Sequence, residues 1–315
     1  MSSHRHDTTD DCCGRSSSAA RHSHAPASFG SAFAIGITLN LGFVIIEVVC
    51  GVFAHSLALV ADAGHNMGDV LGLLLAWCAT FLARTAPTER RTYGLRSSSI
   101  LAALFNAIVL LITVGAIAWE AIRRFGDPTV VEARTVIWVS VIGIVINSAT
   151  ALMFMSGRKR DLNIRAAFMH MAADAGVSLG VVVAGFLIIA TGWRWIDPGI
   201  SLAIAAVITW GTWGLLRDSV NLALHAVPQG IEVADVRQYL SGLPHVTEVH
   251  DLHVWPMSTT ETALTAHLVR DVDDCDCALL DQAARDLYRK FEIQHATLQF
   301  ETLDHHCHLA PEEKV

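Results

Sequence analysis

The segment LALVADAGHNMGDVLGLLLAWCATFLA, residues Leu57–Ala83, is almost entirely apolar, yet it carries His65 and Asp69 in its first half. About 20 apolar residues are enough for a helix to cross the roughly 30 Å hydrocarbon core of a bilayer. An ionisable side chain in such a helix costs about 2.5 to 3.5 kcal/mol at mid-membrane, so each one indicates a function. We therefore predict a spanning helix whose polar residues belong to a functional site.

Five other stretches have the same apolar character. The chain is 52% hydrophobic and 17% charged, against about 25% charged in soluble domains. We predict an α-helical membrane protein with six transmembrane helices, at Phe29–Phe53, Leu57–Ala83, Ser99–Ile122, Val136–Met155, Ala166–Thr191 and Pro198–Leu216. Six crossings place both termini on one side of the membrane.

The distribution of charge indicates which side that is and where the chain divides. Asp218–Val315 carries 6 basic and 17 acidic side chains, a net charge of -11, whereas residues 1–217 carry 16 and 13, a net charge of +3. Basic residues gather in the N-terminal segment and after the second and fourth predicted spans, so the positive-inside rule places both termini in the cytoplasm. The overall charge of -8 disfavours nucleic acid as a partner.

We expect three regions. Residues 1–28 have no apolar signal-peptide core and form a His-rich cytoplasmic tail, residues 29–217 form the transmembrane domain, and residues 218–315 form a cytoplasmic domain. The tail either collects metal weakly or is a disordered segment with no required ligand; its candidate ligands are His4, His6, Cys12, Cys13, His22 and His24.

After Pro228 the chain changes to short alternating segments. Helical spacing and β-branched runs predict an α-β-β-α-β order, which favours a small α+β domain with its helices on one face of the sheet. The five elements are expected at Ile231–Leu240, Val246–Trp255, Thr262–Val269, Leu279–Phe291 and Thr297–Glu301.

Two predicted spans carry the same motif, His-x-x-x-Asp, as His65 with Asp69 and as His170 with Asp174. A spacing of four places both side chains on one helix face. Two such helices facing each other present two imidazoles and two carboxylates, a donor set that suits tetrahedral Zn²⁺. One pair alone would equally suit an interhelical hydrogen bond or a proton relay; two copies favour metal. Asp62 either orients His65 as a hydrogen-bond partner or attracts cations at the outer mouth.

These residues resemble those of the cation diffusion facilitator family, the zinc-transporter group of metal/proton antiporters. The resemblance rests on Ser56–His65 with Asp69, on His170 with Asp174, and on two further stretches. These are Tyr93-Gly94 followed by Ile100–Asn106, and the segment Val249-His250-Asp251-Leu252-His253-Val254-Trp255.

The resemblance implies a six-helix homodimer that holds the transported ion between its second and fifth helices, with a ferredoxin-like cytoplasmic domain that binds regulatory metal. A His at the position of His65 implies zinc. Cytoplasmic ligands are implied at His250, His267 and Glu301, although His250 could instead be structural. Additional ligands are implied at His295, His305, His306, Cys307 and His308.

The sequence departs from the family pattern in two places. Ser97 and Ser99 stand where the family usually has a basic residue and a Glu, which puts a charge contact between helices in doubt. Only Gly157–Arg165 connects the fourth and fifth spans, which resembles a bacterial member and suggests the bacterial inner membrane.

We therefore expect a Zn²⁺/H⁺ antiporter that exports zinc from the cytosol, with Cd²⁺ as a second candidate ion, with lipid around it and no catalytic residues. Export of Co²⁺, Ni²⁺ or Fe²⁺ is the alternative within the class, because the same donors accept these ions. A membrane-anchored metal sensor is an alternative of another class. An intramembrane zinc hydrolase is disfavoured because the chain has no His-Glu-x-x-His motif.

Overall fold

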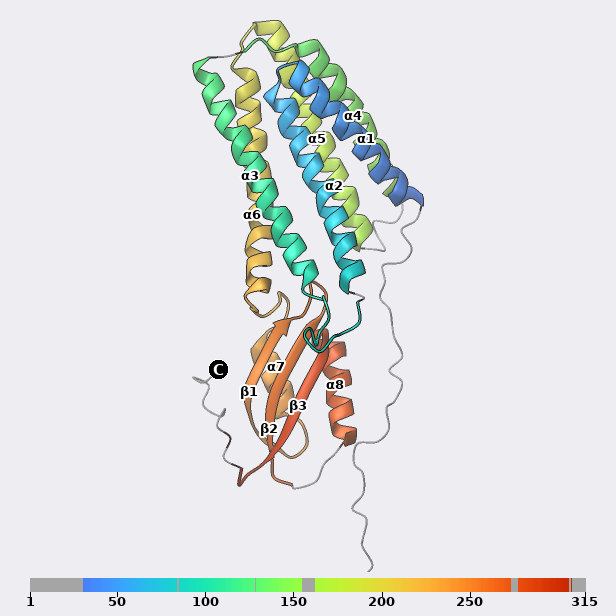
Figure 1. Cartoon of the computed structure of the whole chain (residues 1–315), viewed down its shortest axis with the longest axis vertical. Helices are drawn as coiled ribbons and strands as arrows, with labels where there is room; N and C mark the ends of the chain where they lie inside the picture. The colour runs from blue at the N-terminus through green and yellow to red at the C-terminus, as the bar shows by residue number, and fades with distance from the viewer. Residues whose placement is uncertain are drawn as a thin grey trace, which may run out of the picture. The chain divides into compact units, whose positions relative to one another are not determined.

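The computed structural model describes residues 31–83, 85–127, 129–154, 162–272, 277–305 and 307. The chain forms two compact units, one ending at Val220 and the other starting at Asn221. The first is a helical bundle and the second is a small domain with a sheet (Figure 1). The expected regional boundaries, 1–28, 29–217 and 218–315, stay predictions.

Six long helices make up the bundle. They are α1 Ser31–Phe53, α2 Leu57–Ala83, α3 Ser98–Gly126, α4 Ala133–Phe154, α5 Leu162–Thr191 and α6 Ile196–Ala223. Among the described residues, α3, α6 and most of α4 and α5 are long and apolar enough to cross a membrane, and Thr38–Phe53 is a shorter apolar stretch. Large apolar side chains face outward, with Phe53 79% and Trp210 87% exposed. Such a surface suits lipid rather than water.

Several helices extend beyond the apolar stretches that predicted them. α3 continues to Gly126 instead of ending at Ile122, and α6 continues to Ala223 instead of Leu216. Hydropathy marks the length of chain that suits the hydrocarbon core. Backbone hydrogen bonding continues past that point, where polar side chains are tolerated at the membrane surface.

Small residues let the helices of the bundle approach closely. α2 packs against α1 and α3, and α4 packs against α5 and α1. A Cβ built on Gly68 of α2 would lie 2.6 Å from Leu110 Cδ1 of α3, and one on Gly143 of α4 would lie 2.5 Å from Phe43 Cζ of α1. A larger residue at either position would separate the helices. Small residues commonly let membrane helices pack closely, because the hydrophobic effect does not drive helices together in lipid.

The C-terminal unit follows the predicted order of elements. It consists of α7 Val233–Ser241, β1 Val246–Pro256, β2 Thr262–Arg270, α8 Cys277–Phe291 and β3 Ile293–Thr302. β2 lies in the centre, antiparallel to β1 and parallel to β3. The parallel pair needs a crossover, which α8 provides. β3 starts earlier than the expected Thr297 because Ile293 is buried against the core and pairs with Thr262.

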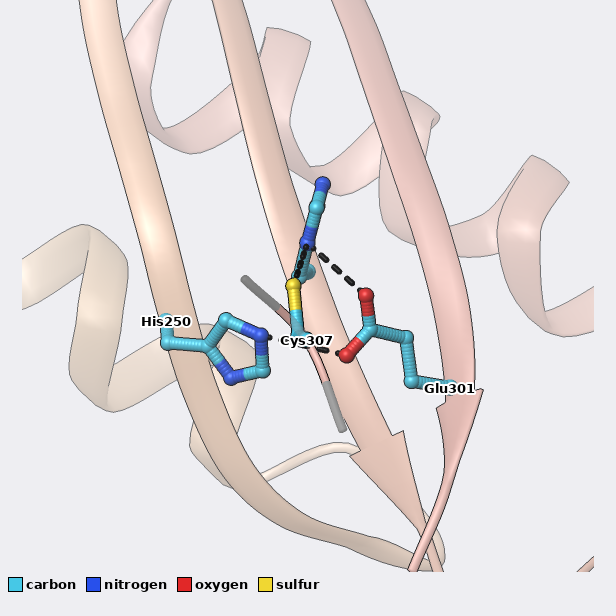
Figure 2. Close-up of side chains that lie close together, drawn as sticks. His250, Glu301 and Cys307 are labelled. Atoms are coloured by element: carbon cyan, nitrogen blue, oxygen red, sulfur yellow. Dashed lines mark hydrogen bonds and ion pairs between the residues drawn. The ribbon is translucent and has the colours of Figure 1, made fainter. Parts of the chain in front are cut away.

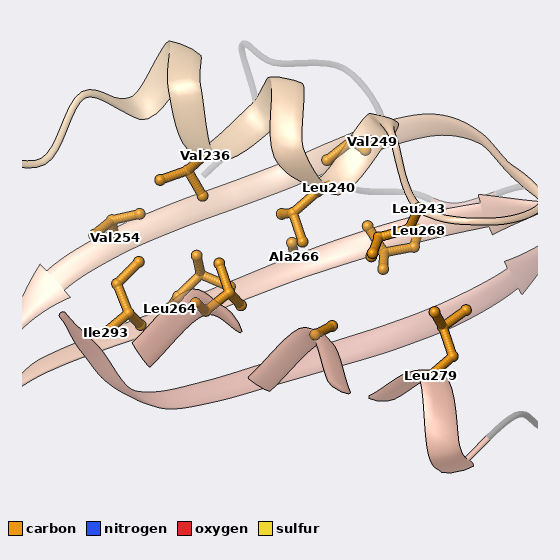
Figure 3. Close-up of a cluster of buried hydrophobic side chains, with 12 residues drawn as sticks. Val236, Leu240, Leu243, Val249, Val254, Leu264, Ala266, Leu268, Leu279 and Ile293 are labelled. Atoms are coloured by element: carbon orange, nitrogen blue, oxygen red, sulfur yellow. The ribbon is translucent and has the colours of Figure 1, made fainter. Parts of the chain in front are cut away.

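One hydrophobic core joins the two helices to a single face of this sheet (Figure 3). The central strand contributes Leu264, Ala266 and Leu268, whose even numbering places them on the same face. α7 contributes Val236 and Leu240; the other members are Leu243, Val249, Val254, Leu279, Ala283, Leu287 and Ile293. The odd-numbered residues of β2, among them His267, therefore lie on the opposite face.

Candidate metal centres

The two His-x-x-x-Asp motifs meet between α2 and α5. His65 Nε2 of α2 lies 3.5 Å from Asp174 Oδ1 of α5, and His170 Nε2 of α5 lies 3.2 Å from Asp69 Oδ2 of α2. Within each helix the corresponding distances are 3.7 Å for His65 to Asp69 and 3.6 Å for His170 to Asp174. Each imidazole thus faces both carboxylates, one on its own helix and one on the partner helix.

Three of the four side chains in this transmembrane cluster meet the spacing of a metal site, and the cluster is partly buried. One ligand atom each from His65, Asp69 and Asp174 lies within 4.8 Å of the others, and the His65 and His170 rings stand edge to face with centroids 6.0 Å apart. The Asp174 side chain is 3% exposed, whereas that of His170 is 39% exposed. Asp69 Oδ2 and Asp174 Oδ2 are buried, and apart from the nearby imidazoles of His65 and His170 they have no hydrogen-bond partner among the described residues. Oxygens left in this state suit a cation, because burying a carboxylate without a partner is costly.

Polar side chains surround the cluster without joining it. Asp62 Oδ2 accepts a hydrogen bond of 3.1 Å from Ser178 Oγ of α5, and no hydrogen bond to His65 is found among the described residues. The expected orienting contact from Asp62 to His65 is therefore replaced by a bond between α2 and α5. Asn66 donates to Glu47 Oε2 of α1 at 3.0 Å. The sequence shows these buried acids but not which residues they contact.

A second cluster lies on the sheet face opposite the helices. His250 of β1, His267 of β2, Glu301 of β3 and Cys307 each place one ligand atom within 4.8 Å of the others. Figure 2 shows His250 and Glu301 pointing toward each other across the central strand, with the Cys307 sulfur between them. His250 Nε2 is 3.1 Å from Glu301 Oε2, and His267 Nδ1 is 2.9 Å from Glu301 Oε1 and 3.4 Å from Cys307 Sγ.

This sheet cluster is more enclosed than the transmembrane one. The side chains of His250, His267 and Glu301 are 5%, 13% and 2% exposed. Two imidazoles, one carboxylate and one thiolate are the donors that Zn²⁺ accepts in tetrahedral sites. The three strands position the first three donors. His250 pairs with His267 in the β1–β2 register, and Glu301 pairs with Val269, two residues after His267 on β2. Cys307 comes from the segment after β3.

Sequence reasoning missed Asp251 as part of this cluster. Asp251 has φ of 48° at an irregularity in β1 pairing, and this conformation turns its carboxylate onto the binding face. Its Oδ1 lies 2.9 Å from His253 Nε2 and its Oδ2 lies 3.5 Å from His267 Nε2. A carboxylate behind a ligating imidazole fixes the ring orientation and raises its basicity. The only signal in the sequence is its place in the Val249–Trp255 segment.

Among the described residues, the other expected ligands, His295 and His305, are not part of the sheet cluster. His295 pairs with Ala263 toward the start of β3, away from Glu301 near its end, and His305 is not part of the group around Cys307. The separation along β3 explains the first case, because each strand residue advances about 3.3 Å. His306 and His308 lie outside the described residues, as does the N-terminal His-rich tail.

Comparison with known proteins agrees with both units. The family model for the cation efflux transmembrane domain matches residues 33–222, and the model for the cation efflux protein cytoplasmic domain matches residues 228–303. The chain belongs to the cation efflux family of membrane transporters, also called cation diffusion facilitators.

Individual relatives match over nearly their whole length. The zinc transporter ZitB of Escherichia coli strain K12 is 38% identical over 283 residues, which cover 88% of this chain and 89% of the relative. The metal cation efflux system protein CzcD of Cupriavidus metallidurans is 35% identical, with 90% of each chain covered. A cadmium, cobalt and zinc/H(+)-K(+) antiporter of Bacillus subtilis is 33% identical, over 90% of this chain and 93% of the relative.

Among solved structures, the metal-bound C-terminal domain of the CzcD transporter is 33% identical. It covers 22% of this chain and 99% of that chain, with a TM-score of 0.21.

Proposed function

We propose that this protein exports Zn²⁺ from the cytoplasm in exchange for protons, with His65, Asp69, His170 and Asp174 as the transport site. The observation that carries the proposal is the convergence of two imidazoles and two carboxylates from α2 and α5. Relatives named as a zinc transporter and as a cadmium, cobalt and zinc/H(+)-K(+) antiporter support zinc and antiport. Zn²⁺ is the cargo and not a resident cofactor.

Proton coupling follows from the chemistry of these ligands. A ligating His must be neutral and a ligating Asp must be ionised, so metal and protons compete for the same atoms. Imidazole has an unperturbed pKa of about 6.5, which allows this exchange in the physiological range. Exposure of the site to one side of the membrane and then to the other couples the two fluxes.

The sheet cluster supports a regulatory metal site in the cytoplasm. Its donors are on the C-terminal unit, which the charge pattern places on the same side as the N-terminus. A bound ion would join β1, β2, β3 and the segment after β3. The family resemblance adds that this unit assembles as a homodimer, and a bacterial inner membrane is the location that suits the relatives.

The test is metal uptake into proteoliposomes across a pH gradient, with Zn²⁺, Cd²⁺, Co²⁺, Ni²⁺ and Mn²⁺ compared. Zinc uptake that dissipates the gradient is expected, and Asp174→Asn should abolish it. Asp127→Asn provides a matched control, because Asp127 follows the last residue of α3 and is exposed. Equal flux in wild type and Asp174→Asn would refute the site, and preference for Co²⁺, Ni²⁺ or Fe²⁺ in an extended series would refute the choice of zinc.

The same assay separates transport from the competing classes. A membrane-anchored sensor would bind metal at the sheet cluster without any flux. Family membership favours a transporter over an enzyme, and the absence of a His-Glu-x-x-His motif from the sequence agrees.

A further inference from the structure

Two buried acids next to the transmembrane cluster have no role in the transport site as proposed. Glu47 of α1 and Asp62 of α2 are both 0% exposed, in two neighbouring helices of the bundle. One oxygen of each has a donor: Asn66 donates to Glu47 Oε2, and Ser178 donates to Asp62 Oδ2. The other oxygens, Glu47 Oε1 and Asp62 Oδ1, are buried with no hydrogen-bond partner among the described residues.

Glu47 and Asp62 are also neighbours whose carboxyl groups interact with each other. A contact between two carboxyls requires a proton, because two adjacent carboxylate anions repel and neither can donate. The charged groups that act electrostatically on the pair are Asp174 of α5, which acts on both acids, and His65 of α2, which acts on Asp62. No Lys or Arg is hydrogen-bonded to either acid among the described residues. One proton held by the pair leaves it with a single negative charge.

The pair lies next to the metal ligands along both helices. Asp62 precedes His65 by three residues on α2, and Ser178 follows Asp174 by four residues on α5. Each interval is about one helical turn, so the Asp62–Ser178 hydrogen bond joins the helices one level beyond the His65–Asp174 contact. In a low-dielectric interior, an ion with a charge of +2 bound at the metal ligands, about one helical turn away, strongly favours a second negative charge on the pair.

We propose that Glu47 and Asp62 form a proton-binding site, separate from the metal ligands, which releases its shared proton when the ion binds. The O–H bond breaks, its electron pair stays on the carboxylate oxygen, and the proton passes to water. When the ion leaves toward the other side, a proton returns to the pair. The pair thereby contributes one proton to the exchange, in addition to those displaced from the four ligands. This inference rests on the proposed function.

The decisive variant is Glu47→Gln, because an amide retains the hydrogen bonds without the exchangeable proton. Its oxygen can still accept from Asn66 and its NH₂ can donate to the Asp62 carboxylate, so we expect the fold to be preserved. Asp62→Asn is the second variant of the pair. Ser140→Ala is the control, since Ser140 of α4 is also fully buried and its hydroxyl has no hydrogen-bond partner among the described residues.

Zinc is titrated into the full-length protein in detergent, with His267→Ala present in every sample to disable the sheet cluster, and the protons released per bound Zn²⁺ are counted. Wild type and Ser140→Ala should release the same number, and Glu47→Gln and Asp62→Asn should release about one fewer. The zinc-induced infrared difference spectrum should show loss of a protonated carboxyl band in wild type and no such loss in Glu47→Gln.

An equal proton count in Glu47→Gln, Asp62→Asn and wild type would overturn the proton site, even with zinc binding intact. A wild type that binds no more zinc than Asp174→Asn would instead overturn the proposed transport site. The two failures are therefore distinguishable in one experiment.

Discussion

Asp197 provides the most direct test of how the bundle holds α2 in place. This residue lies in the first turn of α6, and it is 1% exposed. Its Oδ1 accepts hydrogen bonds from Ser56 Oγ at 2.6 Å and from the Ala58 backbone N–H at 3.3 Å, and its Oδ2 accepts from the Leu57 N–H at 2.9 Å. A carboxylate of one helix therefore caps the N-terminus of another, where free N–H groups and the helix dipole favour a negative charge.

The cost of Asp197→Ala can be worked from these contacts. A hydrogen bond to a charged group contributes about 1.5 to 3 kcal/mol, and loss of a helix N-cap about 0.5 to 2 kcal/mol. The three bonds share one acceptor group and are not additive, so we expect about 3 to 5 kcal/mol of destabilisation. Asp197→Asn keeps one acceptor oxygen, and about 1 to 2 kcal/mol is expected. For a unit of this size, the first change should lower Tm by roughly 10 °C.

The assay is thermal unfolding of the purified protein in detergent, together with zinc flux in liposomes. The order of Tm should be wild type, then Asp197→Asn, then Asp197→Ala, and the exposed control Asp127→Ala should match wild type. Flux should fall with Asp197→Ala because α2 carries His65 and Asp69. A Tm for Asp197→Ala within 2 °C of wild type, an allowance equivalent to about 0.5 to 1 kcal/mol, would refute the capping role.

Three further predictions concern the C-terminal unit. Zn²⁺ at a hundredfold excess over Kd should stabilise wild type by about 2.7 kcal/mol, and His267→Ala should abolish this stabilisation. In thermal melts, a chelator should therefore have no effect on the variant. Burial and then the Asp286 carboxylate raise the pKa of Tyr239 to about 12. The stability that neutral Tyr239 contributes is therefore complete below its unfolded pKa of about 10 and is lost as pH rises through 12. An absorbance titration should lose its last tyrosine step in Tyr239→Phe, and persistence of that step would contradict the assignment. Leu268→Ala should cost about 2 to 5 kcal/mol in chemical denaturation, because Leu268 is fully buried in the core, whereas Leu303→Ala, at an exposed position, should change stability by less than about 0.5 kcal/mol.

Most of the fold could be predicted from local patterns. Long apolar stretches predict membrane helices because every backbone polar group in lipid must be satisfied within the segment. The predicted α-β-β-α-β order is confirmed. It could be predicted because each element of the C-terminal unit has its own periodicity. The His65–Asp69 and His170–Asp174 motifs are visible for the same reason, since a spacing of four has a fixed meaning on a helix.

The partners of the buried polar groups could not be predicted in this way. Nothing local connects Asp197 with the start of α2, more than a hundred residues earlier in the chain, or Asp62 with Ser178. Asp251 joins the sheet cluster only because an irregular strand gives it a left-handed conformation. Each of these contacts depends on how separate elements pack.

The sequence by itself therefore determined that this is a membrane protein with two His-x-x-x-Asp motifs and a small α+β domain. Only the tertiary structure decided that the two motifs face each other, that Cys307 rather than His295 accompanies His250, His267 and Glu301, and that Glu47 and Asp62 are fully buried near the site. The physical reason is range: hydropathy and spacing act over a few helical turns, whereas the position of a ligand or a shared proton depends on side chains brought together by helix and strand packing.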